Sequence, residues 1–288
     1  MQRLIYTGTN YDEVKRLCGD KVLAPYFCMG FSMLSVDTGE GFVSVNEGDT
    51  IVREDNGTLR IEKQGIVHYF VEQGEGFPLI LLHGNGEDGS YFEHQMAPFA
   101  RHFRVIAPDT RGHGRTPRGE APFTIRQFAE DLLAFMDRLG IAKAHLLGFS
   151  DGGNIAMVFA LAHPERVEKL ILDGANLDAS GVKRKIQIPI EIGYRVAKLF
   201  AGKRPEAKKK AELLGLMVND PDVKPEELAR IPCPTLVVAG DRDMIKDSHT
   251  RLIAKSIPGA QLAILPGDHF VANKNPDAFN DAVLRFLL

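Results

Sequence analysis

The sequence of 288 residues is first informative for what it has little of. It contains no tryptophan and only three cysteines, Cys18, Cys28 and Cys233, which form no CxxC pair. An odd number of scattered cysteines argues against a disulfide scaffold and favours a reducing, cytoplasmic location. No His, Asp, Glu or Cys cluster has the spacing of metal ligands, and no glycine-rich loop has a nucleotide-binding form. We therefore expect neither a metal nor a cofactor.

Positive charge and long apolar runs are also scarce. The chain has 35 Lys and Arg against 38 Asp and Glu, which excludes a strongly basic nucleic-acid binder. The longest strongly apolar run, Phe77 to Leu82, is far shorter than the ~18–20 residues that span a bilayer. The first residues lack the apolar core of a secretory signal. The sequence thus predicts no nucleic-acid partner and no membrane span.

Residues 1–64 are rich in glycine and in short alternating apolar runs. Runs at Phe42–Val45, Thr50–Val52 and Leu59–Glu62 predict strands, and Asn10 to Cys18 predicts one helix with Asn10 as its N-cap. We interpret this part as a small, mainly β domain of unknown function. Its edge strands could pair with those of a second copy, so a homo-oligomer formed through this domain is one interpretation.

From residue 65 onward, apolar runs alternate with helical patterns, the clearest helix running from Thr124 to Leu139 with Thr124 and Gln127 as a capping box. Runs that are apolar on both faces are typical of a parallel sheet covered by helices. The alternation predicts an α/β fold with a doubly wound, mostly parallel sheet over residues 65–288. The predicted strands are Leu79–Leu82, Phe103–Ala107, His145–Phe149, Lys169–Leu172, Thr235–Ala239 and Gln261–Leu265.

Residues 176–230 interrupt this alternation, because their pattern is helical and contains no buried strand. They hold 12 Lys and Arg against 8 Asp and Glu, and we interpret them as a helical cap over the edge of the sheet. The basic run Lys208–Lys210 predicts a solvated helix face. We expect most apolar residues of the cap to pack inside it and a few to line a pocket: Ile186, Ile188, Ile190, Ile192, Tyr194, Phe200, Leu213, Leu214 and Met217.

The strongest motif is the G-x-S-x-G sequence at Gly148–Gly152, which follows an apolar strand and opens a helical run. This is the context of a nucleophile elbow, where a serine stands on a sharp turn with its hydroxyl exposed. Glycines two residues to either side let the backbone pass where a side chain would collide. Ser150 is therefore the candidate nucleophile.

A serine hydroxyl needs a base, and the base needs a carboxylate to orient it. In this architecture they follow the serine in the order Asp or Glu, then His, at the ends of later strands. His269 is the candidate base. Asp241 and Asp243 compete for the orienting role, and we favour Asp243, since Asp241 is suited to stabilising its own turn. Asp173, also at a strand end, is a third candidate.

Acyl transfer also needs backbone donors for the developing oxyanion. The predicted donors are the backbone N–H groups of Asp151 and Asn85, while His83 is expected to hold the loop that carries Asn85. The carboxylate of Asp151 admits two interpretations. It could bind an amine on the substrate, as in an amino-acid ester, or it could cap the helix or face solvent.

Five segments in this order resemble the α/β-hydrolase superfamily, and the similarity covers residues 66–288, the cap being least well matched. The resemblance implies a triad of Ser150, Asp243 and His269, and it makes the Asp109–Gly114 loop a structural corner. The Ser-Asp-Gly-Gly form of the elbow most resembles the valacyclovir-hydrolase and enol-lactonase-like esterase branch. The segments are Leu81–Gly84, Asp109–Gly114, Gly148–Gly153, Gly240–Asp243 and Gly267–His269.

The resemblance also separates this chain from some relatives. Epoxide hydrolases and haloalkane dehalogenases carry an aspartate where Ser150 stands, and the halide-binding tryptophans of dehalogenases have no counterpart here. We expect a carboxylesterase-like serine hydrolase that cleaves an ester of a small to medium substrate through an acyl-enzyme. A C–C bond, lactone or peptide hydrolase with the same triad, or a catalytically silent binding module, are the alternatives. Residues 1–64 resemble small phage-type β domains, which implies no chemistry.

Overall fold

A computed structural model describes residues 2–7, 9–28, 31–39, 41–46, 49–62, 66 and 68–288. The chain divides into two compact units, Met1–Val67 and His68–Leu288. The predicted boundary between residues 64 and 65 lies outside the described residues.

The first unit has two three-stranded antiparallel sheets, of order β1-β5-β6 and β2-β3-β4. Buried side chains such as Tyr6, Val14, Leu34 and Ile51 form its core. Its strands confirm the predicted β character, and its helix lies where the sequence indicated. Its elements are β1 (Gln2–Ile5), α1 (Tyr11–Cys18), β2 (Tyr26–Cys28), β3 (Phe31–Asp37), β4 (Phe42–Asn46), β5 (Thr50–Arg53) and β6 (Leu59–Glu62).

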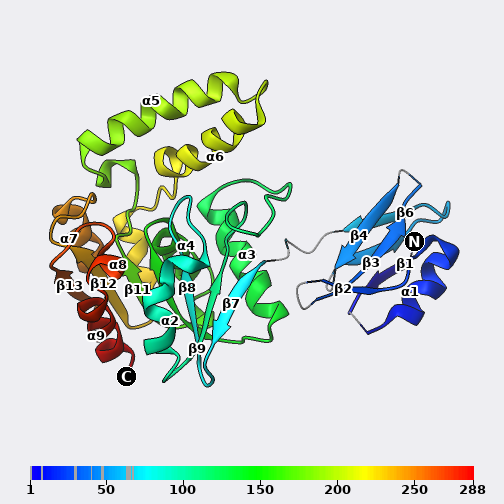
Figure 1. The fold of residues 1–288 in the computed structure, drawn as a ribbon, viewed down its shortest axis with the longest axis horizontal. Helices are drawn as coiled ribbons and strands as arrows, with labels where there is room; N and C mark the ends of the chain where they lie inside the picture. The colour runs from blue at the N-terminus through cyan, green and yellow to red at the C-terminus, as the bar shows by residue number, and fades with distance from the viewer. Residues whose placement is uncertain are drawn as a thin grey trace. The chain divides into compact units, whose positions relative to one another are not determined.

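The second unit is built on a seven-stranded sheet of order β13-β12-β11-β10-β8-β9-β7 (Figure 1). Its strands are parallel except β7, which runs antiparallel to β9 at the edge. The predicted α/β class and the six predicted strands are confirmed, each within two residues of the expected bounds. The strands are β7 (Phe70–Gln73), β8 (Pro78–Leu82), β9 (Arg104–Pro108), β10 (Ala144–Phe149), β11 (Val167–Asp173), β12 (Thr235–Gly240) and β13 (Gln261–Leu265).

Helices cover both faces of this sheet. On one face α3 (Ile125–Arg138), α4 (Asp151–Ala162) and α7 (Asp247–Ser256) bury apolar side chains against the strands. On the other face lie α2 (Glu93–Phe99), α8 (Val271–Lys274) and α9 (Pro276–Leu287). Burial on both faces explains why the inner strands, β8 to β12, are largely apolar.

Strands β1, β2 and β3 were not predicted, and three further local details differ from the predictions. Strand β7 was not predicted, because an edge strand with three exposed residues has a weak apolar pattern. The Asn10 side chain does not cap α1; it accepts from the Thr7 N–H instead, at 2.8 Å. The capping box of α3 is half formed, since Thr124 accepts from the Gln127 N–H at 3.2 Å while the Gln127 side chain donates to Asp131.

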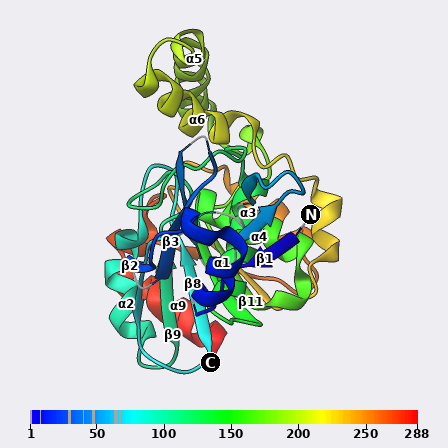
Figure 2. The same ribbon diagram turned by 90° about the vertical axis from the view of Figure 1, so that its right-hand side faces the viewer.

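The cap lies between β11 and β12 and consists mainly of α5 (Arg184–Phe200) and α6 (Pro205–Asn219). All of residues 176–230 are described, and apart from one bridge between Val182 and Ile245 they contain no strand. In two perpendicular views α6 lies nearer the sheet and α5 is outermost (Figures 1 and 2). Short 3₁₀ turns complete the fold at Gly19–Lys21, Gly89–Phe92, Pro164–Arg166, Ala179–Gly181 and Pro225–Arg230.

The expected burial of the cap's apolar residues is wrong for three of them. Ile188, Ile192 and Phe200 are 42%, 57% and 46% exposed. The cap has only two long helices, so α5 can bury one face against α6 while its opposite face stays open. The Lys208–Lys210 run is exposed, as predicted.

Candidate active site

Ser150 occupies the turn that joins β10 to α4. Its φ of 53° and ψ of −118° lie in a region that non-glycine residues rarely adopt, so the turn holds backbone strain. A Cβ atom added to Gly148 would overlap the backbone of Gly152, and one added to Gly152 would overlap the carbonyl of Leu82. Both glycines of the motif are therefore sterically required.

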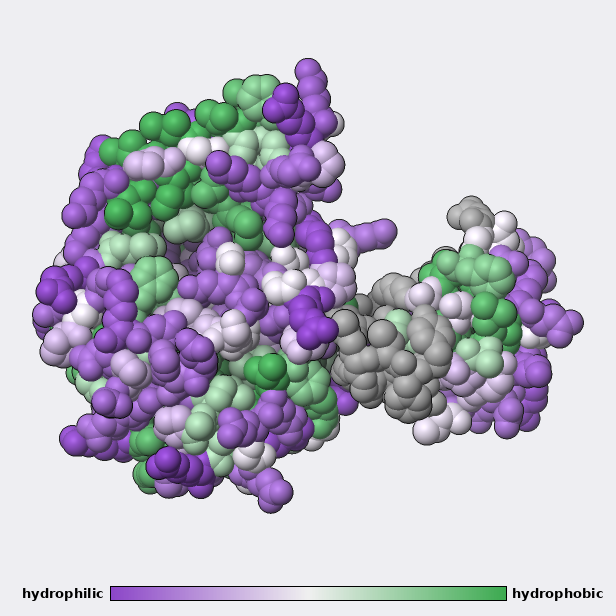
Figure 3. All heavy atoms as spheres, in the orientation of Figure 1, coloured by the Kyte–Doolittle hydropathy of each residue, from purple (hydrophilic) through white to green (hydrophobic). Residues whose placement is uncertain are grey.

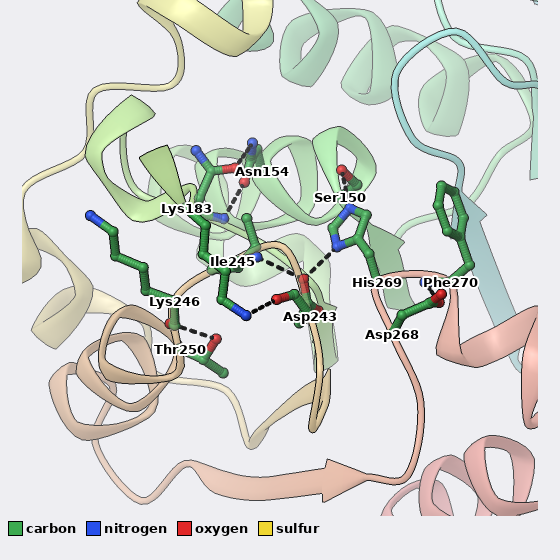
Figure 4. A network of polar contacts seen from close by, with 11 residues as sticks. Ser150, Asn154, Lys183, Asp243, Ile245, Lys246, Thr250, Asp268, His269 and Phe270 are labelled. Carbon is green, nitrogen blue, oxygen red and sulfur yellow. Dashed lines mark hydrogen bonds and ion pairs between the residues drawn. The ribbon is translucent and has the colours of Figure 1, made fainter. Parts of the chain in front are cut away.

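Ser150, His269 and Asp243 form one chain of hydrogen bonds (Figure 4). The Ser150 hydroxyl donates to His269 Nε2 at 3.0 Å, and His269 Nδ1 donates to Asp243 Oδ1 at 2.7 Å. Asp243 comes from the loop after β12 and His269 from the loop after β13, so two adjacent strand ends deliver them. The imidazole is thereby held in the tautomer that can accept a proton from the serine.

Asp243 is further fixed by the start of the cap. Its Oδ1 also accepts from the Ile245 N–H at 2.8 Å, and its main-chain carbonyl accepts from the Lys183 ammonium group. The Lys183 N–H donates to the carbonyl of Met244 at 2.9 Å. Nothing in the sequence pointed to Lys183, because it lies 60 residues before Asp243.

The other two aspartates have different surroundings. Asp241 accepts from the Gly267 N–H at 3.0 Å and so ties the two loops together. Asp173 is fully buried at the end of β11, and neither carboxylate oxygen has a hydrogen-bond partner among the described residues. Burial, and then the charge of Asp243, raise the pKa of Asp173 well above its ordinary value, which favours the neutral form of this carboxyl.

The predicted oxyanion donors are Asn85, on the loop after β8, and Asp151, the first residue of α4. Among the described residues, no acceptor engages the backbone N–H of Asn85 or that of Asp151. The Asn85 side chain donates to Asp151 Oδ2 at 2.8 Å and to the carbonyl of Leu213, on α6, at 2.9 Å. This amide therefore joins the elbow to the cap, a role that the sequence did not indicate.

The Asp151 carboxylate neither caps the helix nor faces solvent, so that interpretation is wrong. It is 7% exposed and accepts from the amides of Asn85 and Asn154. Burial raises its pKa to about 6, and the hydrogen bond from Asn85 partly opposes that shift. Contact of this carboxylate with a substrate amine stays a prediction.

Glu87 is a neighbour of the site that the sequence analysis missed. Its Oε2 accepts from the Gly84 N–H at 3.1 Å and so helps to shape the loop that carries Asn85. Burial raises its pKa to about 7, while the bond from Gly84 acts in the opposite direction. No motif marked this residue, since a glutamate in a polar loop is ordinarily solvated.

His83 and His113 lie inside the fold rather than at the nucleophile. His83 Nε2 accepts from the Thr110 N–H at 3.0 Å, and its Nδ1 donates to the carbonyl of Gly84 at 2.8 Å. Burial lowers the pKa of His83 to about 3, so the ring is neutral. His113 donates to the carbonyl of Arg111 at 2.9 Å. Both rings brace loops, as the sequence analysis expected of His83 and of the Asp109–Gly114 corner that contains His113.

A cavity of about 300 Å³ opens beside His269. Three of its lining residues are cationic, and the start of the cap forms one wall. The lining residues are Lys183, Lys185, Ile186, Arg242, Asp243, Met244, Asp268, His269 and Phe270.

The described residues contain neither a metal-binding cluster nor a membrane-spanning helix. Within them, no group of three or more His, Cys, Asp or Glu side chains is arranged to hold a metal ion. No helix in the described part of the chain has both the length and the apolar character needed to cross a bilayer.

Comparison with known proteins places this geometry in context. The family model described as the alpha/beta hydrolase fold matches residues 78–188. RutD of Caulobacter sp. strain K31, named as a carbamate hydrolase, is 32% identical over 242 residues, which are 73% of this chain and 90% of that protein.

Solved structures give a similar result. The enol-lactonase of Burkholderia xenovorans LB400 is 26% identical with a TM-score of 0.66, covering 78% of this chain and 97% of the other. A meta-cleavage product hydrolase of Pseudomonas fluorescens IP01 is 26% identical with a TM-score of 0.63, covering 77% and 94%. These three proteins are named for three different substrates. The names therefore agree that the reaction is a hydrolysis, but they do not agree on which bond is cleaved.

Proposed function

The chain belongs to the α/β-hydrolase fold family, and on that premise we propose that it is a serine hydrolase. We infer that it cleaves the carboxylic ester of a small to medium substrate through an acyl-enzyme. The observation that carries the proposal is the hydrogen-bond chain from Ser150 through His269 to Asp243, with the serine on a strained turn.

In the first half-reaction, Ser150 Oγ attacks the ester carbonyl while His269 Nε2 takes the hydroxyl proton. Asp243 holds the imidazole and stabilises the positive charge that forms on it. The backbone N–H groups of Asn85 and Asp151 donate hydrogen bonds to the negatively charged carbonyl oxygen. Helix α4, which begins at Asp151, also directs the positive end of its dipole toward this oxygen. His269 then gives its proton to the leaving alcohol.

In the second half-reaction, water replaces the alcohol. His269 takes a proton from the water, the resulting hydroxide attacks the acyl carbon, and the bond to Ser150 Oγ breaks. The serine recovers its proton from His269, and the carboxylic acid leaves. Every proton transfer in this scheme runs through the one nitrogen that the structure aims at Ser150.

An ester is favoured over a C–C bond because of its leaving group. Its alkoxide leaving group needs only the one proton that His269 carries. A C–C bond or lactone hydrolase with the same triad is the second candidate, and the relatives named for an enol-lactone and a meta-cleavage product support keeping it.

Labelling with a serine-directed fluorophosphonate probe tests the proposal. We expect stoichiometric labelling of the wild type and none of Ser150→Ala, with Ser90→Ala, an exposed serine on the neighbouring loop, as the matched control. A silent binding module would stay unlabelled or would label equally in Ser150→Ala.

A series of p-nitrophenyl esters of increasing acyl length then defines the substrate. We expect one acyl length to give the highest kcat/KM, set by the space beneath the cap. If the enzyme reacts with the probe and cleaves no ester, the C–C bond or lactone alternative replaces the ester proposal.

We also propose a cytoplasmic location, which the buried free thiols of Cys18 and Cys233 support. Pairing of two copies through residues 1–64 is a further proposal. Light scattering of the full chain and of a chain lacking residues 1–64 tests it, and an unchanged number of chains per particle would exclude the pairing.

A further inference from the structure

The outer helix of the cap carries an unusual concentration of exposed apolar side chains. In the described part of the chain twelve large hydrophobic side chains are exposed, and five of them lie on α5. We call these five the α5 stripe: Ile188, Ile192, Val196, Leu199 and Phe200, which are 42%, 57%, 51%, 77% and 46% exposed. Single exposed apolar residues are ordinary, whereas a contiguous row marks an interaction surface.

The α5 stripe faces away from the other cap helix. Gln187 donates to the carbonyl of Met217 on α6, and Gly193 and Tyr194 lie against Leu214 and Gly215 of the same helix. At 3.6 residues per turn, the centre of the stripe lies about half a turn from Gln187 and Tyr194 and about a quarter of a turn from Gly193. In both views α6 lies between α5 and the sheet, so the face of α5 opposite α6 is the outer face of the cap (Figures 1 and 2).

Positive charge surrounds the stripe. Residues 184–204 contain six Lys and Arg and a single acidic residue, Glu191. The six cations are all exposed, and none forms an ion pair within the described residues: Arg184, Lys185, Arg195, Lys198, Lys203 and Arg204. Figure 3 shows hydrophobic residues along the outer edge of the cap, with hydrophilic residues at its ends.

We propose that α5 docks the enzyme on an anionic lipid surface. An amphipathic helix with an apolar face and flanking Lys and Arg lies in the plane of the headgroups, its apolar side chains inserted and its cations on the phosphates. This is peripheral binding by a helix of 17 residues and requires no membrane span. It would let the enzyme work on esters that partition into the bilayer.

Charge decides between a lipid surface and a second copy of the chain. Two α5 stripes placed face to face would bring two sets of six cations together, with only Glu191 on each side to offset them. An anionic surface instead neutralises those cations. The charge complementarity thus selects lipid as the occupant.

Sedimentation of the full chain with vesicles tests the proposal without relying on catalysis. We expect the protein to pellet with an equimolar mixture of phosphatidylcholine and phosphatidylglycerol, and to remain in solution with phosphatidylcholine alone. High salt should release it, because screening weakens the attraction to the headgroups. No pelleting with the anionic vesicles at low salt would overturn the proposal.

Two pairs of substitutions separate the apolar and the charged contributions. Ile192→Ser with Leu199→Ser should weaken vesicle binding by roughly 10-fold or more, through loss of inserted apolar surface. Arg195→Gln with Lys198→Gln should weaken it by roughly 30-fold, at about 1 kcal/mol for each cation. Matched controls are Leu252→Ser with Leu288→Ser, and Lys208→Gln with Lys210→Gln, all exposed residues outside the stripe.

The controls should bind vesicles as the wild type does. Equal binding by wild type and both stripe variants would show that another surface is responsible and would overturn the proposal. A chain that is dimeric by light scattering and becomes monomeric with Ile192→Ser and Leu199→Ser would assign the stripe to a second copy instead. Circular dichroism checks that each variant is folded.

Discussion

Helix α4, which follows the nucleophile elbow, and helix α5, the outer helix of the cap, both carry many apolar residues, yet they differ in how far those residues are buried. Helix α4 buries ten of its 12 residues, whereas α5 buries two of 17. In the elbow, neighbouring atoms on every side leave room only for glycine at two positions. On α5 one face meets α6 and the other meets solvent. Where packing is complete, the residues fix the position of the catalytic groups. Where one face remains open to solvent, its residues are available to bind another surface.

The largest effect should come from the orienting aspartate. Asp243→Asn leaves the shape of the site but favours the wrong imidazole tautomer, and we expect kcat on an ester to fall by roughly 10⁴-fold. Asp241→Asn, two residues away, only weakens the bond accepted from the Gly267 N–H and leaves the bond from His269 to Asp243 intact, so it should change kcat far less. Steady-state kinetics of the two variants decide, and equal losses would contradict the assignment.

A glycine in the elbow and a glycine in the cap give the next comparison. Gly152→Ala forces a methyl group into the backbone beneath it, and we expect the free energy of unfolding to fall by about 4 kcal/mol or more. Gly202→Ala, in the loop between the cap helices, meets nothing within 4 Å and should be neutral or slightly stabilising. Urea unfolding measures both. A tolerated Gly152→Ala would show that the elbow is less tightly packed than its geometry indicates.

The buried carboxyl of Asp173 should make stability depend on pH. Its pKa in the folded state is raised by burial, so above the ordinary value of 3.8 the unfolded chain loses this proton first and is favoured. Wild-type stability should therefore fall as the pH rises above 3.8, by at most about 1.4 kcal/mol for each pH unit because a single proton is involved. Asp173→Asn should lack that part of the slope. Thermal melts across this range measure it, and identical slopes would contradict a raised pKa of Asp173.

The smallest effect is expected on the open face of the cap. In the absence of lipid, Ile192→Ser should change the free energy of unfolding by less than about 0.5 kcal/mol, since the side chain is already in water. Turnover of a water-soluble ester should be unchanged. A marked loss of stability would mean that the stripe is covered in solution, and it would remove the contrast with the elbow.

Much of the second unit could be predicted because its signals are local. A strand buried on both faces must be apolar along its length, which is why β8 to β12 were found within two residues of their ends. The spacing of the glycines around Ser150 indicates the elbow. Asp243 and His269 follow from the rule that the carboxyl ends of parallel strands share one edge of the sheet.

Other features depend on contacts between distant parts of the chain and left no local signal. The Asn85 amide meets a cap carbonyl 128 residues away, and Lys183 meets the loop of Asp243 60 residues away. The raised pKa of Asp173 depends on how completely the fold excludes water from it. Strand β7 becomes a strand because β9 offers it hydrogen bonds at the edge.

The sequence by itself determined the α/β class, the order of the strands along the chain and the residues suited to nucleophile, base and acid, because each depends on neighbours in the chain or on chemical type. Tertiary structure decided which aspartate meets His269, which amides hold Asp151 and which face of α5 remains open. Those outcomes depend on which elements pack together, and packing brings together residues that the chain keeps far apart. The apolar residues of the cap show this most directly, since the same composition could have formed a buried core.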